Sequence, residues 1–317
     1  MSCGKGIPYA RSVTTSSEPI IPADPQRIRE RFSTGLSDDT RRGASRLWLP
    51  SVDSTQRFLM REAKEHPEFW PHASGVGANY QTAGHGRRGN AWQAAPGASV
   101  SMSILLKPAR LGPGLQAQYW PWITLVAAAT LVDWFGELGV TAQVKWPNDV
   151  LGSDGRKLVG ILAQVVDEDR VILGLGINRD FGGSDQQRPV DTAAALSDYN
   201  PVLATVGSRK LADEAMTRLV AGLETFTERV NPPNPDHVED ELRRLSRLIV
   251  TEGQYISGEL PGQRRLTGWI RGLGDTGSLL VEPDPSLPED TLEDLPRDPD
   301  TGWVDLTSAV IHHVRPR

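Results

Sequence analysis

The sequence predicts an α+β fold in which a mixed β-sheet is flanked by helices and followed by a smaller all-β module. Two patterns and the chain length lead to this class. Up to about residue 247, strand-like apolar runs alternate with stretches whose apolar residues recur at helical spacing. Beyond that point, short apolar runs are separated by glycine turns. The chain has 317 residues, which is enough for two hydrophobic cores.

The elements of the larger part follow from the spacing of apolar residues. A helix is expected over residues 57–63, with Ser54 or Thr55 placed to cap it. A long buried helix is expected over 119–138 and another helix over 211–230. Strands are expected over residues 47–49, 75–81, 99–107, 142–146, 157–166 and 171–177. The fourth strand ends at Pro147, because proline cannot donate to a ladder, and the last two form a hairpin around an acidic turn.

The chain divides into three parts. Residues 1–45 are rich in Ser, Thr, Pro, Gly and Arg, lack the two amphipathic helices of a helix-turn-helix module, and are expected to form a mobile extension. Residues 46–247 form the larger part and residues 248–317 the all-β module. The expected strands of this module cover 248–250, 254–256, 265–271, 279–282, 303–306 and 310–314. The last two are placed to close a small barrel, and the acidic, proline-rich segment 283–300 is expected to be a solvated loop.

Composition excludes several classes of protein. The net charge of −6 argues against sequence-blind nucleic-acid binding, which needs a basic surface. Cys3 is the single cysteine, so no internal disulfide can form and a reducing cytoplasm is the expected location. The longest apolar stretch, residues 120–135, is too short and too polar to span a bilayer, and no secretory signal is seen.

The loop Gly84-His85-Gly86-Arg87-Arg88-Gly89 matches the pattern G-x-G-x-x-G. A dinucleotide-binding fingerprint must lead into a helix, but residues 90–99 contain Pro96 and Gly97 and show no helical period. A second match, Gly272 to Gly277, lies in an expected β-turn. The three glycines of the first loop allow close approach of a ligand, and two arginines offer forked donors to an anion. The loop alone fits an anion site and a solvated basic turn equally well.

The segment Lys145-Trp146-Pro147-Asn148-Asp149 is the second cluster of chemical interest. A strand that stops at a proline presents its next side chains from a loop, where ligands can reach them. Lys157 follows at the start of an apolar strand, where an ammonium group is placed to meet an anion. Taken one at a time, Lys145 and Lys157 fit a charged, solvated hairpin end better than a binding site.

Taken together, these segments resemble a known family. Five of them occur in one order: Ser54-Thr55-Gln56, Gln81 to Gly89 with Trp92, Lys145 to Asp149, Arg156 to Leu162, and Gly174 to Asn178. This arrangement is similar to the biotin–[acetyl-CoA carboxylase] ligase family, in the form without an N-terminal DNA-binding domain. The resemblance covers roughly residues 46–317. It implies a class II synthetase-like catalytic domain and an SH3-like barrel at the C-terminus.

The resemblance also implies an activity. The family joins the carboxylate of biotin to the α-phosphate of ATP and then passes biotin to a lysine of the biotin carboxyl carrier protein of an acetyl-CoA or acyl-CoA carboxylase. Cations and Mg²⁺ suit this reaction, because a negative nucleophile must approach a polyanion. The implied catalytic residues are Lys157 and Arg87, which neutralise charge, and Asp149, a base for the carrier lysine. The metal ligands are unknown.

The implied binding residues form two overlapping sets. Biotin would contact Ser54, Thr55, Gln81, Gly84, Arg87, Arg88, Gly89, Lys157 and Gly160. The nucleotide would contact Arg87, Arg88, Trp92, Lys145, Asn148, Lys157 and Asn178. Trp92 would pack near the adenine or cover the closed site, and Gly160 and Gly176 would keep one wall of the pocket thin.

Two features depart from the family pattern, and two other functions compete. His85 stands where the family usually has arginine, and the stretch between Asp149 and Lys157 is slightly long. A lipoate–protein ligase on the same scaffold is the nearest rival, and a non-enzymatic biotin sensor or repressor is the rival from another class. The paired glycine-arginine loop and the 145–149 segment favour biotin. No nucleic-acid or membrane partner is expected, and a homodimer is one possible assembly.

Overall fold

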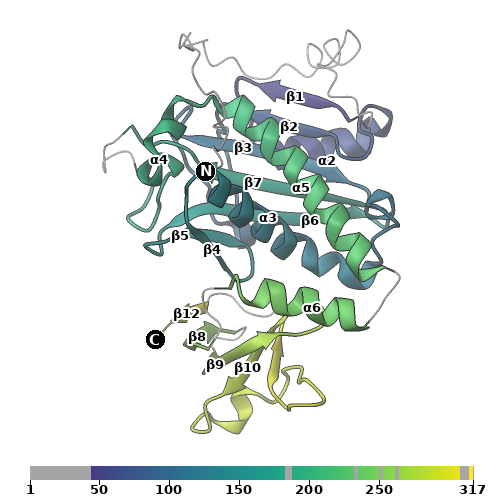
Figure 1. The fold of residues 1–317 in the computed structure, drawn as a ribbon, viewed down its shortest axis with the longest axis vertical. Coiled ribbons are helices and arrows are strands. Elements are labelled where there is room, and N and C mark those ends of the chain that lie inside the picture. Colours follow the sequence, from purple (N-terminus) through teal and green to yellow (C-terminus); the bar gives the residue numbers. More distant parts are fainter. Residues whose placement is uncertain are drawn as a thin grey trace, which may run out of the picture.

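The computed structural model describes residues 44–182, 188–231, 235–249, 253–260, 264–307 and 314–316. These residues form a seven-stranded sheet with its helices and a separate five-stranded sheet (Figure 1). The expected extension over residues 1–45 lies almost wholly outside the described residues. The division into 46–247 and 248–317 stays a prediction. Within the described parts, no helix combines the length and the apolar character that a membrane span requires.

The seven-stranded sheet has the order β1-β2-β3-β7-β6-β5-β4. Its strands are β1 (Arg46–Leu49), β2 (Gly75–Ala78), β3 (Ser99–Leu106), β4 (Ala142–Lys145), β5 (Asp149–Gly152), β6 (Lys157–Asp167) and β7 (Arg170–Asn178). The first two strands are parallel because helix α2 (Thr55–Glu65) crosses between them, and every other neighbouring pair is antiparallel. The sheet is therefore mixed, as predicted, and the 157–177 hairpin is confirmed.

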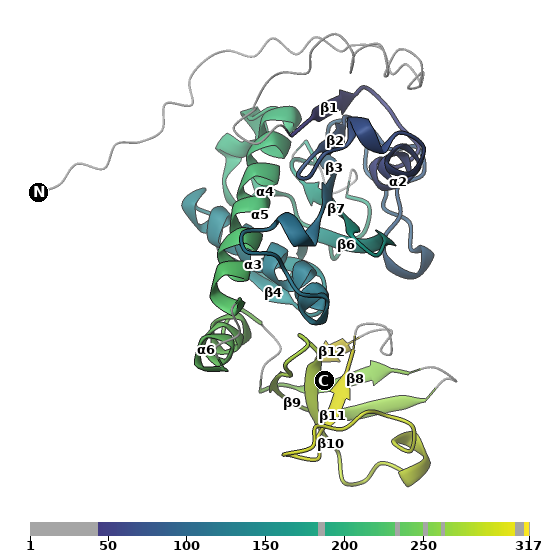
Figure 2. The same ribbon diagram turned by 90° about the vertical axis from the view of Figure 1, so that its right-hand side faces the viewer.

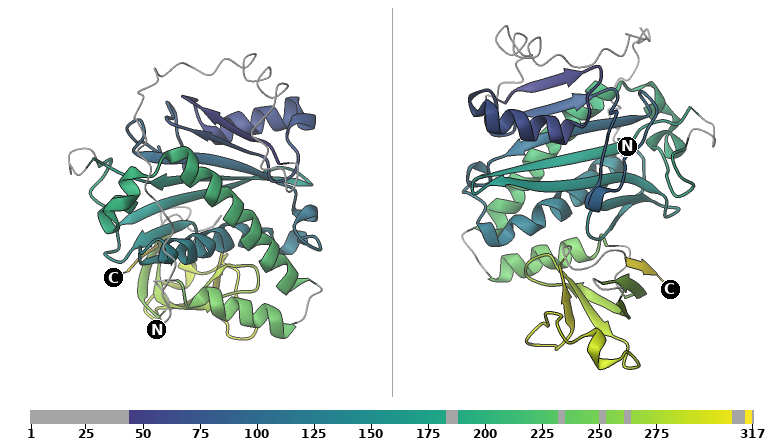
Figure 3. Two further views of the ribbon diagram at one scale, coloured as in Figure 1. Left: turned by 45° about the horizontal axis from the view of Figure 1, so that its top comes forward. Right: turned by 180° about the vertical axis from the view of Figure 1, so that it is seen from behind.

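Helices cover the two faces of this sheet unequally. Helices α3 (Ile123–Glu137) and α5 (Ser208–Val230) pack together on one face (Figure 1). Helix α2 lies on the opposite face, which the right-hand view of Figure 3 shows from behind. Successive residues of β3 reflect this arrangement, since Ile104 belongs to the large core under α3 and α5 and Leu105 to the smaller core under α2. On the face of the sheet that carries α2, the area beside this helix has no helix over it (Figure 3).

The helix boundaries have local causes. The hydroxyl of Ser54 accepts a hydrogen bond from the backbone N–H of Arg57, so Ser54 caps α2. Helix α3 begins at Ile123 rather than at residue 119, because Pro121 lies in a preceding 3₁₀ turn over Ala117–Trp122. Three elements were not predicted: strand β5, helix α4 (Leu196–Tyr199) and helix α6 (Pro235–Ser246). Strand β5 and helix α4 span only four residues each, and α6 carries few apolar residues.

The C-terminal sheet has the order β11-β10-β9-β8-β12 and is antiparallel throughout. Its strands are β8 (Tyr255–Glu259), β9 (Arg265–Leu273), β10 (Leu279–Pro283), β11 (Val304–Leu306) and β12 (Val314–Pro316). Figure 2 shows this sheet below the larger one, and α6 packs against both α5 and β9.

Two expectations for this module need correction. The barrel is not closed, because β11 and β12 lie at opposite edges and no pairing joins them within the described residues. The strand expected over 248–250 does not belong to this sheet: Val144 of β4 donates to the carbonyl of Leu248 at 2.9 Å, and Ile249 forms a parallel bridge with Val144. The linker into the module therefore pairs with the edge of the larger sheet. Of the strand expected over 310–314, only Val314 is described.

Candidate active site

A cavity of about 710 Å³ opens on the α2 face of the seven-stranded sheet. Most of its wall comes from the first turn of α2, the glycine-arginine loop, the segment after β4, and the facing strands β6 and β7. Gln81, Ser103 of β3, Thr192 and the β5–β6 hairpin complete it. Because β6 and β7 are neighbours in the middle of the sheet, they form a rigid floor on which the loops converge. Many of the predicted site residues line this cavity: Ser54, Thr55, Gln81, Arg87, Arg88, Trp92, Lys145, Asn148, Asp149, Lys157 and Gly160.

Two cations of the cavity, Arg87 and Lys157, contact side chains of the segment after β4. Arg87 Nη1 donates to Asn148 Oδ1 at 3.3 Å, which ties the glycine-arginine loop to the segment after β4. Lys157 Nζ lies 2.7 Å from Asp149 Oδ1. Burial lowers the pKa of Arg87, and the charge of Arg88 lowers it further, although Asp149 acts in the opposite direction. Arg87 stays charged at neutral pH, and its guanidinium group is partly stripped of water.

The floor of the cavity carries the indole ring of Trp92. A Cβ atom added at Gly176 would lie 2.3 Å from Trp92 Cε2, and one added at Gly160 would lie 2.9 Å from Trp92 Cζ3. The ring therefore lies directly on the two glycines, as only residues without a side chain allow. Lys157 Nζ is 5.6 Å from the centre of the ring, within cation–π range. Trp92 Nε1 is buried and has no hydrogen-bond partner in the described part of the chain.

The far end of the cavity is polar. Gln81 Oε1 accepts hydrogen bonds from the backbone N–H and the hydroxyl of Thr55, at 2.8 and 3.2 Å. The Thr55 hydroxyl also lies 2.9 Å from the hydroxyl of Ser103. Gln56 Nε2 donates to the carbonyl of Leu162 at 3.2 Å. These buried and partly buried donors and acceptors suit a cyclic urea, whose N–H and C=O groups need partners when buried.

The site predictions missed several wall residues, notably Gln56 and Ser103. Gln56 follows the predicted Ser54 and Thr55 directly, and its placement in the first turn of α2 was the available signal. Ser103 lies in β3, where no local pattern distinguishes a serine that faces a cavity from one that faces a core. Gly174 was quoted as part of a motif, and a Cβ atom there would lie 2.2 Å from Gln56 Oε1.

Three predicted binding residues do not line the cavity. Gly84 and Gly89 lie in the loop but outside the cavity wall. Asn178 is only 3% exposed, and both ends of its amide are used within the protein. Its Nδ2 donates to the carbonyl of Lys157 at 3.1 Å, and its Oδ1 accepts from Ser99 Oγ at 3.2 Å. In this structure Asn178 holds the backbone at Lys157.

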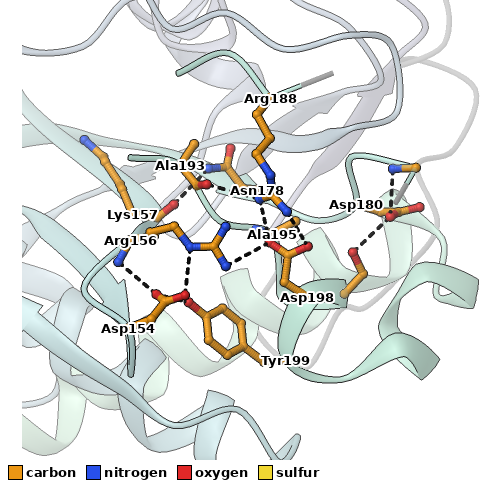
Figure 4. A network of polar contacts seen from close by, with 12 residues as sticks. Asp154, Arg156, Lys157, Asn178, Asp180, Arg188, Ala193, Ala195, Asp198 and Tyr199 are labelled. Atoms are coloured by element: carbon orange, nitrogen blue, oxygen red, sulfur yellow. Dashed lines mark hydrogen bonds and ion pairs between the residues drawn. The ribbon is translucent and has the colours of Figure 1, made fainter. Parts of the chain in front are cut away.

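The backbone around Lys157 is held by a polar network (Figure 4). Lys157 donates its backbone N–H to the carbonyl of Thr192 at 2.7 Å and accepts from the N–H of Ala194 at 2.9 Å. Arg188 makes a forked contact with Asp198, at 2.7 and 3.1 Å. Arg156 reaches both Asp198 and Asp154, and the Tyr199 hydroxyl donates to Asp154 at 2.5 Å. The segment 188–199 thus clamps the start of β6.

The structure shows where the two departures from the family pattern lie: the longer stretch between Asp149 and Lys157, and His85 in place of arginine. The stretch between Asp149 and Lys157 is the β5–β6 hairpin, which closes through a hydrogen bond from Gly152 N–H to Arg156 O of 2.8 Å. Lys157 therefore still reaches Asp149 despite the added length. Burial lowers the pKa of His85, and Arg57 lowers it further, while Asp53 acts in the opposite direction. The surroundings of His85 therefore favour its uncharged form.

The chain is similar to known ligases. A model of the family described as "Biotin/lipoate A/B protein ligase family" matches residues 48–178. A biotin–[acetyl-CoA-carboxylase] ligase of Mycobacterium tuberculosis is 30% identical over 213 residues, covering 65% of this chain and 71% of that protein. A bifunctional ligase/repressor BirA of Bacillus subtilis is 36% identical over 165 residues, which is 50% of this chain and 46% of that protein. The chain thus spans just under half of the Bacillus protein.

Solved structures share the fold. A biotin protein ligase from Aquifex aeolicus, solved in complex with biotin and ATP, has a TM-score of 0.61 with 22% sequence identity. The match covers 86% of this chain and 99% of that one. The mixed sheet with its flanking helices and the small antiparallel sheet are therefore an arrangement already known in solved proteins.

Proposed function

Since the chain belongs to the biotin/lipoate A/B protein ligase family and is close to its biotin–protein ligases, we propose that it is an ATP-dependent biotin–protein ligase. It forms biotinyl-5′-AMP and transfers biotin to a lysine of a biotin carboxyl carrier domain of an acetyl-CoA or acyl-CoA carboxylase. One observation carries the proposal. Arg87 and Lys157 line a single cavity whose other end offers the polar groups of Thr55, Gln81 and Ser103.

The first step is a displacement at phosphorus. A carboxylate oxygen of biotin attacks the α-phosphorus of ATP, and pyrophosphate leaves with the electrons of the broken P–O bond. Arg87 and Lys157 offset the repulsion between the two anions, and burial of Arg87 strengthens this effect because fewer waters screen its charge. Trp92 on the glycine floor keeps water from the mixed anhydride.

The second step is acyl transfer. The amine of the carrier lysine attacks the carbonyl carbon of the adenylate, and AMP leaves. Asp149 takes the proton that the attacking amine loses. Since Asp149 Oδ1 is paired with Lys157, its availability depends on Lys157 turning toward the phosphate or carboxylate of the adenylate. The two proposed roles are thus coupled through one ion pair.

The cavity wall suits a nucleotide-borne Mg²⁺. The described residues contain no group of three or more His, Cys, Asp and Glu that could enclose a metal ion. Mg²⁺ at nucleotide sites usually takes one or two protein oxygens and completes its shell with phosphates and waters. Asn148 and Asp149 carry oxygens of this kind in the wall. When bound, the ion would neutralise part of the phosphate charge.

The proposal is tested by two assays on the full chain. The first measures biotin-dependent exchange of labelled pyrophosphate into ATP, with lipoate and octanoate as alternative acids. The second measures transfer of labelled biotin to a carrier domain, with a carrier whose acceptor lysine is replaced by arginine as the control. We expect exchange and transfer when biotin is the acid, and neither reaction with lipoate or octanoate. Activity with lipoate in place of biotin would identify the rival lipoate–protein ligase, and no exchange with any acid would refute a ligase.

A further inference from the structure

The second glycine motif, Gly272 to Gly277, binds two tryptophans of the larger part. It forms the turn between β9 and β10, closed by a hydrogen bond from Gly277 N–H to Gly274 O of 2.9 Å. Trp122 Nε1 donates to the carbonyl of Asp275 at 2.9 Å. Trp146 Nε1 donates to the carbonyl of Gly277 at 3.0 Å. We call this pair of contacts the tryptophan clasp.

Only one arm of the clasp leads into the cavity. Trp146 is 3% exposed and itself lines the cavity, as do Pro147, Asn148 and Asp149, which follow it directly. Trp122 is equally buried, but it ends the 3₁₀ turn before α3 and does not line the cavity. The two indoles therefore make the same kind of bond to the same turn and differ in what they are attached to.

A second contact holds β4 two residues before Trp146. Val144 of β4 pairs with Leu248 and Ile249, the linker into the C-terminal sheet. Residues 144 and 146 are thus both fixed by the C-terminal part of the chain. Asn148 lies two residues after Trp146. Its Oδ1 accepts a hydrogen bond from Arg87, and its Nδ2 donates to the carbonyl of Ile161 at 2.8 Å.

We propose that Trp146 is a positioning residue, through which the C-terminal module sets the place of Asn148 and Asp149 for the nucleotide. The inference rests on the proposed ligase function and extends it. Removing the bond from Trp146 to Gly277 frees the 146–149 segment, so that its contacts with the phosphates weaken. The polar end of the cavity is built by α2, β3 and Gln81, so that biotin binding is largely spared.

The test compares Trp146→Phe with Trp122→Phe in the full chain. Each variant keeps an aromatic ring and loses one indole N–H donor to the turn. Pyrophosphate exchange is measured over ranges of ATP and of biotin, and thermal unfolding and ATP binding by calorimetry are measured alongside. We expect both variants to lose similar stability. Trp146→Phe should raise the KM for ATP about tenfold, with the KM for biotin changed less than about twofold, whereas Trp122→Phe leaves both within about twofold.

A second pair of variants acts from the other side of the bond. Gly277 has a φ of +74°, and a Cβ atom there would lie 3.2 Å from Leu125 Cδ1 and 3.3 Å from Trp122 Cδ2, so Gly277→Ala disturbs the turn that both indoles bind. Gly277 itself does not line the cavity. Gly302 has a φ of +72° with nothing within 4 Å, so Gly302→Ala carries the same backbone strain away from the clasp. Of these two variants, we expect only Gly277→Ala to raise the KM for ATP selectively. This variant also tests the proposal if Trp146→Phe fails to fold.

The outcomes separate the two proposals. A wild-type chain without biotin-dependent exchange refutes the ligase function, while a tenfold loss of ATP affinity confined to Trp146→Phe and Gly277→Ala still supports the positioning role. The positioning role is refuted if the wild type is active and all four variants keep its KM for ATP. It is also refuted if the KM for ATP rises in all four variants in proportion to their loss of stability.

Discussion

The ammonium group of Lys157 lies 2.7 Å from a carboxylate oxygen of Asp149. Asp149 is the first residue of β5 and Lys157 is the first residue of β6. The hairpin formed by these two strands brings the side chains together. The pair keeps a cation and an anion next to each other in a cavity that is otherwise rich in positive charge. An arriving phosphate or carboxylate competes with Asp149 for Lys157, which would leave the aspartate free to accept a proton.

Replacing Lys157 by alanine should abolish the first step. The change removes the cation that offsets the repulsion between biotin and ATP, and it leaves Asp149 without its partner. We expect biotin-dependent pyrophosphate exchange to fall about 100-fold or more, by comparison with other losses of a group that stabilises developing charge. Lys64→Ala, on the exposed surface of α2, is the matched control and should exchange normally. Normal exchange by the Lys157 variant would show that its assigned role is wrong.

Adding a side chain at Gly176 should displace Trp92 from the floor. The new Cβ atom would lie 2.3 Å from Trp92 Cε2, so the ring must move or the strand must shift. Overpacking of this kind costs about 1–3 kcal/mol of stability, and exchange activity should fall with it. In a double-mutant cycle, Trp92→Ala should remove most of this cost, and additive losses in stability would contradict the contact.

A glycine that touches nothing gives the opposite result and serves as the control. Gly136 lies in α3, is exposed, and has no atom within 4 Å of an added Cβ. Because alanine favours a helix over glycine, Gly136→Ala should gain about 0.5–1 kcal/mol in chemical unfolding, with unchanged activity.

Glu241 of α6 should contribute stability that disappears in acid. Burial alone would raise its pKa, but hydrogen bonds from Arg244 and Arg229 and their charges lower the pKa below its ordinary value of 4.5. A lowered folded-state pKa means that the carboxylate stabilises the protein above the unfolded-state pKa, and that this contribution is lost as pH falls through the folded-state pKa.

The measurement for Glu241 is chemical unfolding of wild type and Glu241→Gln between pH 3 and 8. The variant should be less stable at pH 7 by about 1–2 kcal/mol, since two arginines lose a charged partner. The difference should shrink toward acid, below about pH 4.5. A difference that stays constant over the whole range would rule out the ion pairs as its source.

The clamp on Lys157 should loosen when Asp198 loses its charge. Asp198→Asn weakens the forked contact with Arg188 and the longer one with Arg156. Amide hydrogen exchange should then quicken at Lys157 and Ala194, whose backbone hydrogen bonds join β6 to the 188–199 segment. Asp133→Asn, which weakens an exposed pair with Arg244, is the control and should leave that exchange unchanged. Unchanged protection in both variants would mean that the backbone bonds alone hold the segment.

The motifs of the site could be found from the sequence, because each is a short run of residues whose composition is recognisable without knowledge of the fold. The glycine-arginine loop and the segment ending at Pro147 were visible from their composition and from the limits that proline and glycine place on the backbone. Ser103 was missed, since a serine in a strand carries no local sign of which cavity it faces. The family resemblance assigned Asn178 to the nucleotide, whereas in this structure its Nδ2 donates to the carbonyl of Lys157.

By itself the sequence determined the mixed class of the fold, most of its helices and strands, and the identity of the charged groups that line the cavity. Periodicity, caps and breakers act over a few residues, so they can be read along the chain. Only the tertiary structure decided that Trp92 lies on Gly160 and Gly176, and that Trp146 is held by a turn 131 residues away. Such contacts depend on how finished elements pack against each other, and the spacing of residues in the chain does not encode them.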